Sequence, residues 1–357
     1  MALTLNTAQP ARHPAPTVKA QALAYLMFER PDLDLAERFL ADFGLVRSAR
    51  TPDVLFMRAA EPRAFCYVAF KADKPRFRGL GLQVRSRDDL ERLSELPGAS
   101  AIESVTWPGG GERVVLKDPA GFEVHAVHGA APAPPLERRA PAVWNVGGRH
   151  ARVDAPQRPP HAPPEVLKLG HVVLELADFQ RAAAWYTQHL GFIPSDVQLL
   201  PDGSPAVAFM RLDLGETPAD HHTLALAQGV VDTYSHSAYE LVDADAVGMG
   251  QRLLKSAGWR HAWGIGRHLL GSQVFDYWQD PYGDKHEHYT DGDVFTADRP
   301  TGFHPLSRQG MAQWGEEMPK SFAKPKPSVP LVLSALKNIL GGAVPIGTVR
   351  KLAAALF

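Results

Sequence analysis

The chain has 357 residues, a formal net charge of −1 and one cysteine, Cys66. This length favours two domains with extensions, and the near-zero charge argues against nucleic acid or an anionic membrane as partner, so we expect a small molecule or a second copy of the chain. A lone cysteine excludes an intrachain disulfide framework, and no apolar run approaches the roughly 20 residues that span a bilayer. We therefore expect a cytoplasmic protein without a membrane span.

Residues 1–18 are expected to form a flexible tail, because they contain prolines and lack the apolar core of a signal peptide. A first module is expected over residues 19–129. A strand that includes Tyr25 is followed by a helix from Leu33 to Phe43, with Asp32 as its N-cap and Gly44 as its stop. The other strands of this module are predicted at 54–58, 64–70, 79–84, 112–117 and 122–127, with a helix at 87–93.

The same order of elements returns in a second module, expected over residues 165–298. It follows a Pro- and Ala-rich linker at 130–164, and its predicted elements are strands at 169–176, 206–212, 223–227, 237–242 and 274–278 with helices at 178–190 and 246–257. The helix-opening aspartate lies seven residues after Tyr25 in the first module and seven after His171 in the second. The turn Asp118-Pro119-Ala120-Gly121 recurs as Asp280-Pro281-Tyr282-Gly283. This regularity indicates an internal duplication.

A C-terminal extension is expected over residues 299–357. It has few strand signals, and residues 329–356 are predicted to form two helices separated at Gly341 and Gly342. Their apolar residues predict packing onto a partner subunit or back onto the body of the protein. A homo-oligomer is therefore expected rather than a monomer.

Three metal-ligating side chains occupy matching places in the second module. His171 lies in its first strand, His236 at the head of a later one, and Glu287 on the strand after the Asp-Pro-Tyr-Gly turn. Two neutral imidazoles and one carboxylate form the facial set that leaves open positions on a non-haem Fe(II). His286 and His288 share the strand face opposite Glu287, so this pair is a rival ligand set.

The alternation of side chains along the first strand of this module orients His171. Val172, Leu174 and Leu176 form a wholly apolar face suited to packing beneath the following helix. His171 belongs to the opposite face, which also carries Glu175. We therefore expect His171 to point into a cavity.

The second module resembles the type I extradiol ring-cleavage dioxygenases of the vicinal-oxygen-chelate superfamily, which also includes the glyoxalases and bleomycin-resistance proteins. The resemblance rests on segments 169–174, 220–226 and 266–268, on His236 and Tyr277, and on Asp280-Pro281-x-Gly283-x-x-x-Glu287-His288-Tyr289. Residues 19–293 are similar to that family's two-domain body. The resemblance implies an α+β fold with two tandem modules, each of paired βαβββ units forming half-barrel-like sheets, and an active site in the C-terminal module.

The resemblance also implies the cofactor. Fe(II) would be held by His171, His236 and Glu287, with O2 as co-substrate; the ligand set itself also accepts Mn(II). The segment Ser235–Glu240 departs from the family, which more often has paired histidines and an apolar strand there. His236 is therefore the ligand for which the resemblance is weakest.

Three further residues receive catalytic roles from the resemblance. His222, rather than its neighbour His221, would be the acid and base beside the O2 position, and His268 and Tyr277 would hydrogen-bond the substrate. The chemistry agrees with these roles, because a metal helps a catechol to lose a proton and a histidine can supply protons near neutral pH. A tyrosine is too weak an acid to be the main proton source.

The first module tests this assignment internally. Tyr25 stands where His171 stands in the second module, Gly79 lies near the place of His236, and His125 occupies the place of Glu287. This set cannot form the same metal site, so we expect the N-terminal module to be a scaffold.

The sequence therefore predicts an Fe(II)-dependent extradiol dioxygenase that cleaves a catecholic small molecule. Its pocket walls are expected to include Phe209, the segment from Val247 to Trp263 and residues after Tyr289. One alternative is a glyoxalase-type metal-dependent isomerase or lyase of the same superfamily. The other is a metal-free protein that binds a small molecule without chemistry.

Overall fold

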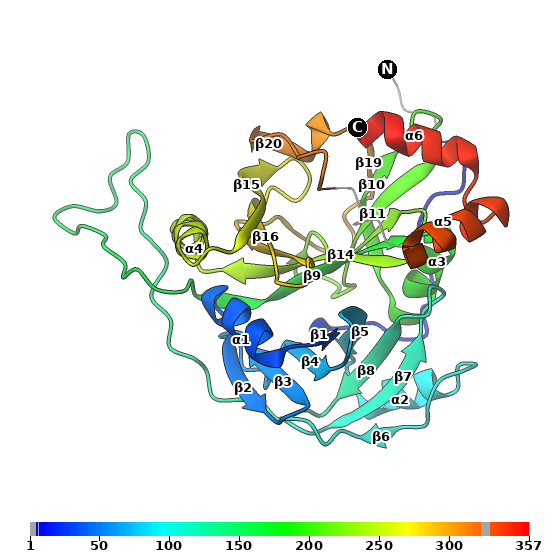
Figure 1. Cartoon of the computed structure of the whole chain (residues 1–357), viewed down its shortest axis with the longest axis horizontal. Helices are drawn as coiled ribbons and strands as arrows, with labels where there is room; N and C mark the ends of the chain where they lie inside the picture. Colours follow the sequence, from blue (N-terminus) through cyan, green and yellow to red (C-terminus); the bar gives the residue numbers. More distant parts are fainter. Residues whose placement is uncertain (1–4, 6, 323–328, 357) are drawn as a thin grey trace.

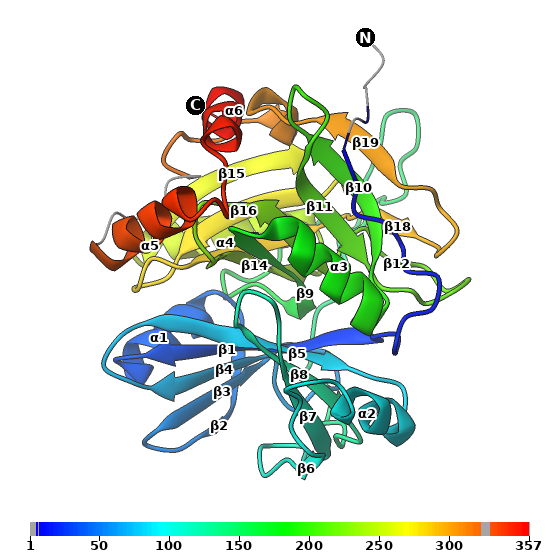
Figure 2. The ribbon, with the colours of Figure 1, turned by 90° about the vertical axis from the view of Figure 1, so that its right-hand side faces the viewer.

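The computed structural model describes residues 5, 7–322 and 329–356 and arranges them around two large sheets, one in each module (Figures 1 and 2). Residues 1–4 and 6 of the expected tail, and residues 323–328 and 357 of the expected extension, lie outside this description. The predicted α+β class with two tandem modules is confirmed. Within the described residues, none of the helices has the length and apolar character needed to cross a bilayer.

The N-terminal module forms an eight-stranded sheet in the order β2-β3-β4-β1-β5-β8-β7-β6. Its first strand lies between β4, to which it is parallel, and β5, to which it is antiparallel. The elements are β1 (Ala22–Arg30), α1 (Leu33–Asp42), β2 (Val46–Arg50), β3 (Val54–Arg58), β4 (Tyr67–Lys71), β5 (Arg76–Gln83), α2 (Arg87–Ser94), β6 (Glu103–Ser104), β7 (Glu112–Lys117) and β8 (Glu123–His128).

The C-terminal module repeats this plan in a ten-stranded sheet of order β19-β10-β11-β13-β9-β14-β17-β16-β15-β20. Here β9 is parallel to β13 and antiparallel to β14, just as β1 is to β4 and β5. The elements are β9 (Val166–Leu176), α3 (Phe179–Leu190), β10 (Ile193–Leu199), β11 (Pro205–Arg211), β12 (Ala219–Asp220), β13 (Leu224–Gln228), β14 (Thr233–Leu241), α4 (Ala244–Ser256), β15 (Arg260–His268), β16 (Val274–Gln279), β17 (Lys285–Thr290), β18 (Val294–Phe295), β19 (Gly302–Pro305), the 3-10 turn η1 (Gln309–Met311), β20 (Ala312–Gly315), α5 (Val329–Leu340) and α6 (Ile346–Leu356).

The capping and turn signals of the sequence act as predicted. The side chain of Asp32 accepts the N–H groups of Asp34 and Leu35 at the start of α1, and Gly44, just past its end, has a φ of +103° that disfavours other residues. In the repeated turn, Asp280 accepts the N–H groups of Tyr282 and Asp284. Asp118 holds the first turn in the same way, so both copies enter their last strand alike.

Several strands of the structure have no alternating pattern in the sequence that predicts them. In β10, the polar residues Ser195, Asp196 and Gln198 hide the alternation, yet all three are buried. Few strand signals were expected after residue 299, and the described residues there form the short strands β19 and β20, which pair with β10 and β15 and complete both edges of the sheet. These edge strands have four residues each and no fully buried position, so they carry no apolar pattern to detect.

The two ends of the chain pack on the C-terminal module. The tail differs from the flexible segment expected: Thr17 donates its N–H to the Gln188 carbonyl at 2.8 Å, Arg12 pairs with Asp213 at 2.8 Å, and Val18 is buried. The two C-terminal helices form as predicted, and α6 returns to the body, where the Ala355 carbonyl accepts the Arg308 N–H at 3.1 Å. Residues 130–164 make an extended excursion at the side of the molecule (Figure 1).

A buried ion pair joins the two modules. Arg30, at the end of β1, is fully buried and pairs with Asp280 at 3.1 Å and Asp284 at 2.7 Å in the turn that leads into β17. Its Nε also donates to the hydroxyl of Tyr67 at 3.1 Å. The N-terminal module therefore fixes the turn that leads into the strand carrying Glu287.

Replacing Arg30 tests this role. Arg30→Met leaves Asp280 buried without its cation, so we expect the free energy of unfolding to fall by about 3–5 kcal/mol. Arg76→Met is the matched control, because Arg76 is 63% exposed in its pair with Glu29 and should cost at most about 1 kcal/mol. Urea unfolding of both variants measures the difference. Equal losses would contradict the assigned role of Arg30.

Candidate metal centre

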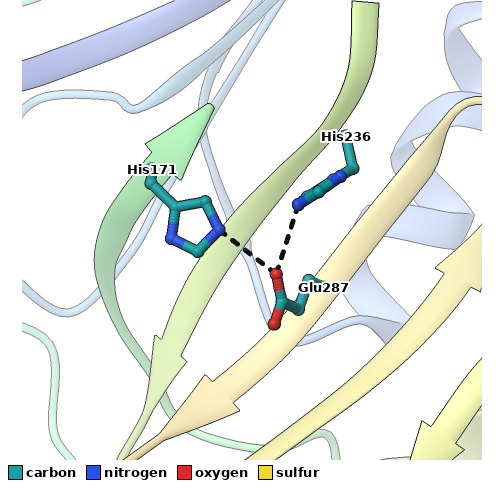
Figure 3. Close-up of side chains that lie close together, drawn as sticks. All are labelled: His171, His236 and Glu287. Carbon is teal, nitrogen blue, oxygen red and sulfur yellow. Dashed lines mark ion pairs between the residues drawn. The ribbon is translucent and has the colours of Figure 1, made fainter. Parts of the chain in front are cut away.

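His171, His236 and Glu287 converge on one point of the C-terminal sheet (Figure 3). Their ligating atoms all lie within 4.8 Å of one another. Oε2 of Glu287 is 3.2 Å from Nε2 of His171 and 3.6 Å from Nε2 of His236. His236 was predicted to begin its strand, but it is the fourth residue of β14.

Strand register explains why the three side chains meet. Ala238 of β14 lies directly opposite His171 of β9 on one side and Glu287 of β17 on the other. Directly paired residues share a face of the sheet, and so do residues two apart on one strand, so His236 joins the same face as Ala238. Three adjacent strands therefore present one ligand each to the same side.

The charge state of these groups suits a cation. Burial by itself raises the pKa of Glu287, but the close imidazoles of His171 and His268 more than offset this and hold the pKa below its usual range. Burial lowers the pKa of His236 well below its ordinary value. The site thus combines a carboxylate with a neutral imidazole, which are the protonation states that a metal requires of its ligands.

Buried polar atoms without partners also fit a cation-binding site. Both carboxylate oxygens of Glu287 are buried, and neither has a hydrogen-bond partner of good geometry. A fully buried carboxylate is costly unless it is paired or coordinates a metal. The donor set therefore fits a divalent transition metal.

The rival ligands His286 and His288 lie on the opposite face of β17. Nε2 of His288 is 2.7 Å from the carbonyl oxygen of Phe43, and its ring stacks on that of Phe43 with centroids 3.8 Å apart. Nδ1 of His286 is 3.1 Å from Oγ of Ser237. The structure does not bring either ring together with Glu287, and both serve the packing between the modules.

His222 lines the same cavity just before β13, with its ring centroid 4.0 Å from that of His171. Burial, together with the neighbouring histidines, lowers its pKa well below the ordinary value. Its Nδ1 lies 2.9 Å from Nδ1 of His221, whose Nε2 is 2.6 Å from Oδ2 of Asp196. Oδ1 of Asp196 is in turn 2.8 Å from Nε2 of His304.

When His221 is neutral, one arrangement of the hydrogens satisfies this hydrogen-bonded chain. Burial tends to raise the pKa of Asp196, but the bonds from His221 and His304 hold it below its usual range, so Asp196 is an acceptor. A neutral His221 that donates from Nε2 must accept at Nδ1, which makes Nδ1 of His222 the donor. Nε2 of His222 then remains free to accept a proton. Sequence reasoning missed Asp196 and His304 because both lie on strands that it did not predict.

His268 and Tyr277 also face the cavity, and they contact each other. Nε2 of His268 is 2.9 Å from the hydroxyl of Tyr277, and its Nδ1 donates to the Met311 carbonyl at 2.9 Å. Tyr277 lies directly opposite Glu287 in the sheet. Burial and the charge of Glu287 raise its pKa well above the ordinary value, so Tyr277 keeps its proton as a hydrogen-bond donor.

The corresponding place in the N-terminal module is filled. Gly81 lies opposite both Tyr25 and His125, just as Ala238 lies opposite His171 and Glu287. The hydroxyl of Tyr25 is 2.9 Å from Nδ1 of His125, and a Cβ added to Gly81 would lie 2.5 Å from the ring of Tyr25. An aromatic ring therefore occupies this place in the duplicate.

The candidate metal centre opens into a cavity of about 400 Å³. Phe209 contributes to its wall as expected, and so do residues beyond Tyr289, among them Leu306 and Met311. The expectation for residues 247–263 was wrong, because α4 packs its apolar residues into the core on the other side of the sheet. The cavity wall comes instead from the C-terminal extension.

Comparison with known proteins finds relatives over most of the chain. Residues 168–287 match the family described as the Glyoxalase/Bleomycin resistance protein/Dioxygenase superfamily. Metapyrocatechase 2 of Cupriavidus necator is 31% identical over 320 residues, which cover 88% of this chain and 94% of that protein. Biphenyl-2,3-diol 1,2-dioxygenase of Pseudomonas sp. (strain KKS102) is 25% identical over 277 residues, covering 73% of this chain and 85% of that protein.

Two solved structures share the fold at lower identity. A Mn(II)-bound glyoxalase from Novosphingobium aromaticivorans has a TM-score of 0.73 and 23% identity, covering 87% of this chain and 97% of its own. Homoprotocatechuate 2,3-dioxygenase from Arthrobacter globiformis has a TM-score of 0.72 and 20% identity, covering 90% and 95%. At these identities the likeness concerns the fold alone.

Metal binding tests the candidate centre. Glu287→Gln keeps the size of the side chain and removes its charge, so we expect the affinity for Fe(II) or Mn(II) to fall by more than about 100-fold, since loss of an outer partner alone costs 10–100-fold. His125→Gln, at the equivalent place of the duplicate, should leave the affinity unchanged. Anaerobic metal titration of the metal-free protein measures both. Unaltered affinity in Glu287→Gln would remove it from the ligand set.

Proposed function

Because this chain belongs to the type I extradiol dioxygenases of the vicinal-oxygen-chelate superfamily, we propose that it is an Fe(II)-dependent enzyme that opens a catecholic ring beside its two hydroxyl groups with O2. The observation that carries the proposal is that the three candidate ligands converge on one point and that two of them, His171 and His236, line the same cavity as three candidate proton-handling groups. Those groups are His222, His268 and Tyr277.

The proposed metal ligands are His171, His236 and Glu287, which accept Fe(II) or Mn(II), and we favour Fe(II) from the family. A metal bound there supplies the chemistry of lowering the pKa of a catechol hydroxyl and of holding both reactants in one place. The chain supplies the remainder. Its apolar cavity excludes water, and its histidines and tyrosine handle the protons.

We propose His222 as the base and later the acid. Its buried ring is neutral, and the Asp196–His221 pair holds its hydrogen on Nδ1. Nε2 can therefore take the proton of a catechol hydroxyl and return it to the reacting oxygen as the ring opens. A positioned group of this kind contributes about 10²- to 10⁴-fold to a rate.

We assign His268 and Tyr277 to orientation of the substrate. The Met311 carbonyl fixes the ring of His268 and keeps a hydrogen on its Nδ1, which leaves Nε2 to accept the Tyr277 hydroxyl hydrogen. When a catechol enters, Tyr277 is free to donate to an oxygen on which negative charge develops, because its own pKa lies well above ordinary. Preorganised donors of this kind stabilise such charge.

Two alternatives predict different behaviour. A glyoxalase-type isomerase or lyase would use the metal ligands. It does not need His222 hydrogen-bonded through His221 to Asp196, nor the His268–Tyr277 pair. A metal-free binding protein would leave the buried carboxylate of Glu287 without a cation, which is costly. Both alternatives lack the consumption of O2.

The expected homo-oligomer and cytoplasmic location stay predictions. In support of a second copy as partner, α5 has large apolar side chains that the described residues leave exposed, namely Leu333, Leu336 and Leu340. No nucleic-acid partner is expected from the net charge of −1.

Oxygen uptake tests the proposed reaction. Protein purified without O2 and loaded with Fe(II) should consume O2 when given a catechol and form a yellow ring-opened product. The metal-free protein and Glu287→Gln serve as controls, and both should be inactive. Absence of O2 consumption with a panel of catechols, in protein shown to contain iron, would refute the dioxygenase proposal.

Two substitutions separate proton transfer from metal binding. His222→Asn should retain iron and lower kcat by about 10²- to 10⁴-fold, because the base is removed while the ligands stay. Asp196→Asn should lower kcat by about 10- to 100-fold with little change in KM, because it only loosens the orientation of His222. Asp298→Asn is the matched control, since Asp298 is 96% exposed. Full activity in His222→Asn would remove it as the proton carrier.

A further inference from the structure

The cavity continues past the histidines into an apolar chamber. Leu352 and Leu356 of α6 form part of its wall together with Leu306 and Val207. Met318 and Phe322 of the extension line another side. The same cavity is lined by the histidines and the tyrosine that could hold a metal or move a proton, namely His171, His222, His236, His268 and Tyr277.

Helix α6 is held against the sheet from both sides. Its apolar residues join a cluster with Leu200, Ala206 and Leu306, and Lys351 forms an ion pair with Asp202. Figure 1 shows α6 at the end of the C-terminal sheet, above β10 and β19. This helix belongs to the extension, so the extension shapes the chamber together with residues of the duplicated module.

The charge of the wall is informative. Among the described residues that line the cavity there is no lysine or arginine, and the carboxylate among them is that of Glu175. Two cations near the cavity, among the residues that the structure describes, have hydrogen-bond partners: Nζ of Lys285 donates to the Phe322 carbonyl at 2.8 Å, and Arg308 pairs with Glu317 at 2.8 Å. A carboxylate carried into the chamber would lose its hydration without gaining a countercharge, which is unfavourable.

The volume supports a substituted ring. A cavity of about 400 Å³ lies in the range of roughly 300–1,000 Å³ typical of pockets for drug-sized ligands. One unsubstituted ring bound at the candidate metal would leave the apolar part empty. An uncharged alkyl or aryl substituent would fill it and gain free energy from the apolar surface that it buries.

We infer that the substrate is a catechol with an uncharged apolar substituent, alkyl or aryl, which lies in the chamber against Leu352 and Leu356 of α6. This inference rests on the proposed function and adds the substrate class to it. The two leucines then determine specificity, because they contact the part of the substrate that differs between catechols.

Matched substrates test the inference. Kinetics with 3-butylcatechol and with 3-(2,3-dihydroxyphenyl)propanoate compare substituents of similar length, one apolar and one anionic, and a 4-substituted pair repeats the comparison. We expect kcat/KM to favour the apolar member by at least about 100-fold, because the anion is buried without a partner. Equal values, or a preference for the anion, would overturn the inference. Failure to cleave these and catechol itself would instead overturn the proposed function.

Variants of α6 locate the effect. Leu352→Lys adds a cation to the wall and should lower the preference for the apolar member by at least about tenfold, since an ion pair becomes available to the anion. Ala354→Lys is the matched control, because Ala354 is exposed on the same helix and does not line the cavity. Leu352→Ala adds no charge to the apolar wall, so it disturbs the fold less than Leu352→Lys. It should weaken binding of the butyl compound and raise its KM. An unchanged preference in both Leu352 variants would overturn the role of α6.

Discussion

A buried carboxylate is the constraint on which the rest of this structure depends. Glu287 is fully buried, and its nearest partners of opposite potential charge are imidazoles, of which His236 is kept neutral by burial. Such a group is tolerated when a cation shares the site. The adjacent strands β9, β14 and β17 each carry one candidate ligand on the same face of the sheet. Strands β16 and β15 place Tyr277 and His268 in the wall of the same cavity.

The duplication divides the work between two similar modules. The N-terminal copy keeps the strand pairing, but Tyr25 and His125 bond to each other where the C-terminal copy has His171 and Glu287. The N-terminal copy has a structural role instead. Its Arg30 forms an ion pair with Asp284 in the turn before β17, and its Phe43 stacks on His288, the residue after Glu287. A module without metal ligands thereby still determines the position of one of them.

The sequence predicted what depends on local pattern. The repeat, the Asp-capped helices and the turn before Glu287 follow from spacing and turn chemistry, and the face of His171 follows from alternation. It could not predict Asp196, because β10 buries polar residues whose partners, His221 and His304, are distant in sequence. Nor could it predict the chamber wall, because the apolar residues of α6 show only that the helix packs on something. These features arise from tertiary pairing rather than from local preference.

Anomalous diffraction at the iron edge tests the central claim most directly. Crystals of the protein loaded with Fe(II) without O2 should show one iron peak within bonding distance of His171, His236 and Glu287, on the cavity side of the C-terminal sheet. An iron peak beside His286 and His288, or no peak at Glu287 in protein shown to contain iron, would contradict the account.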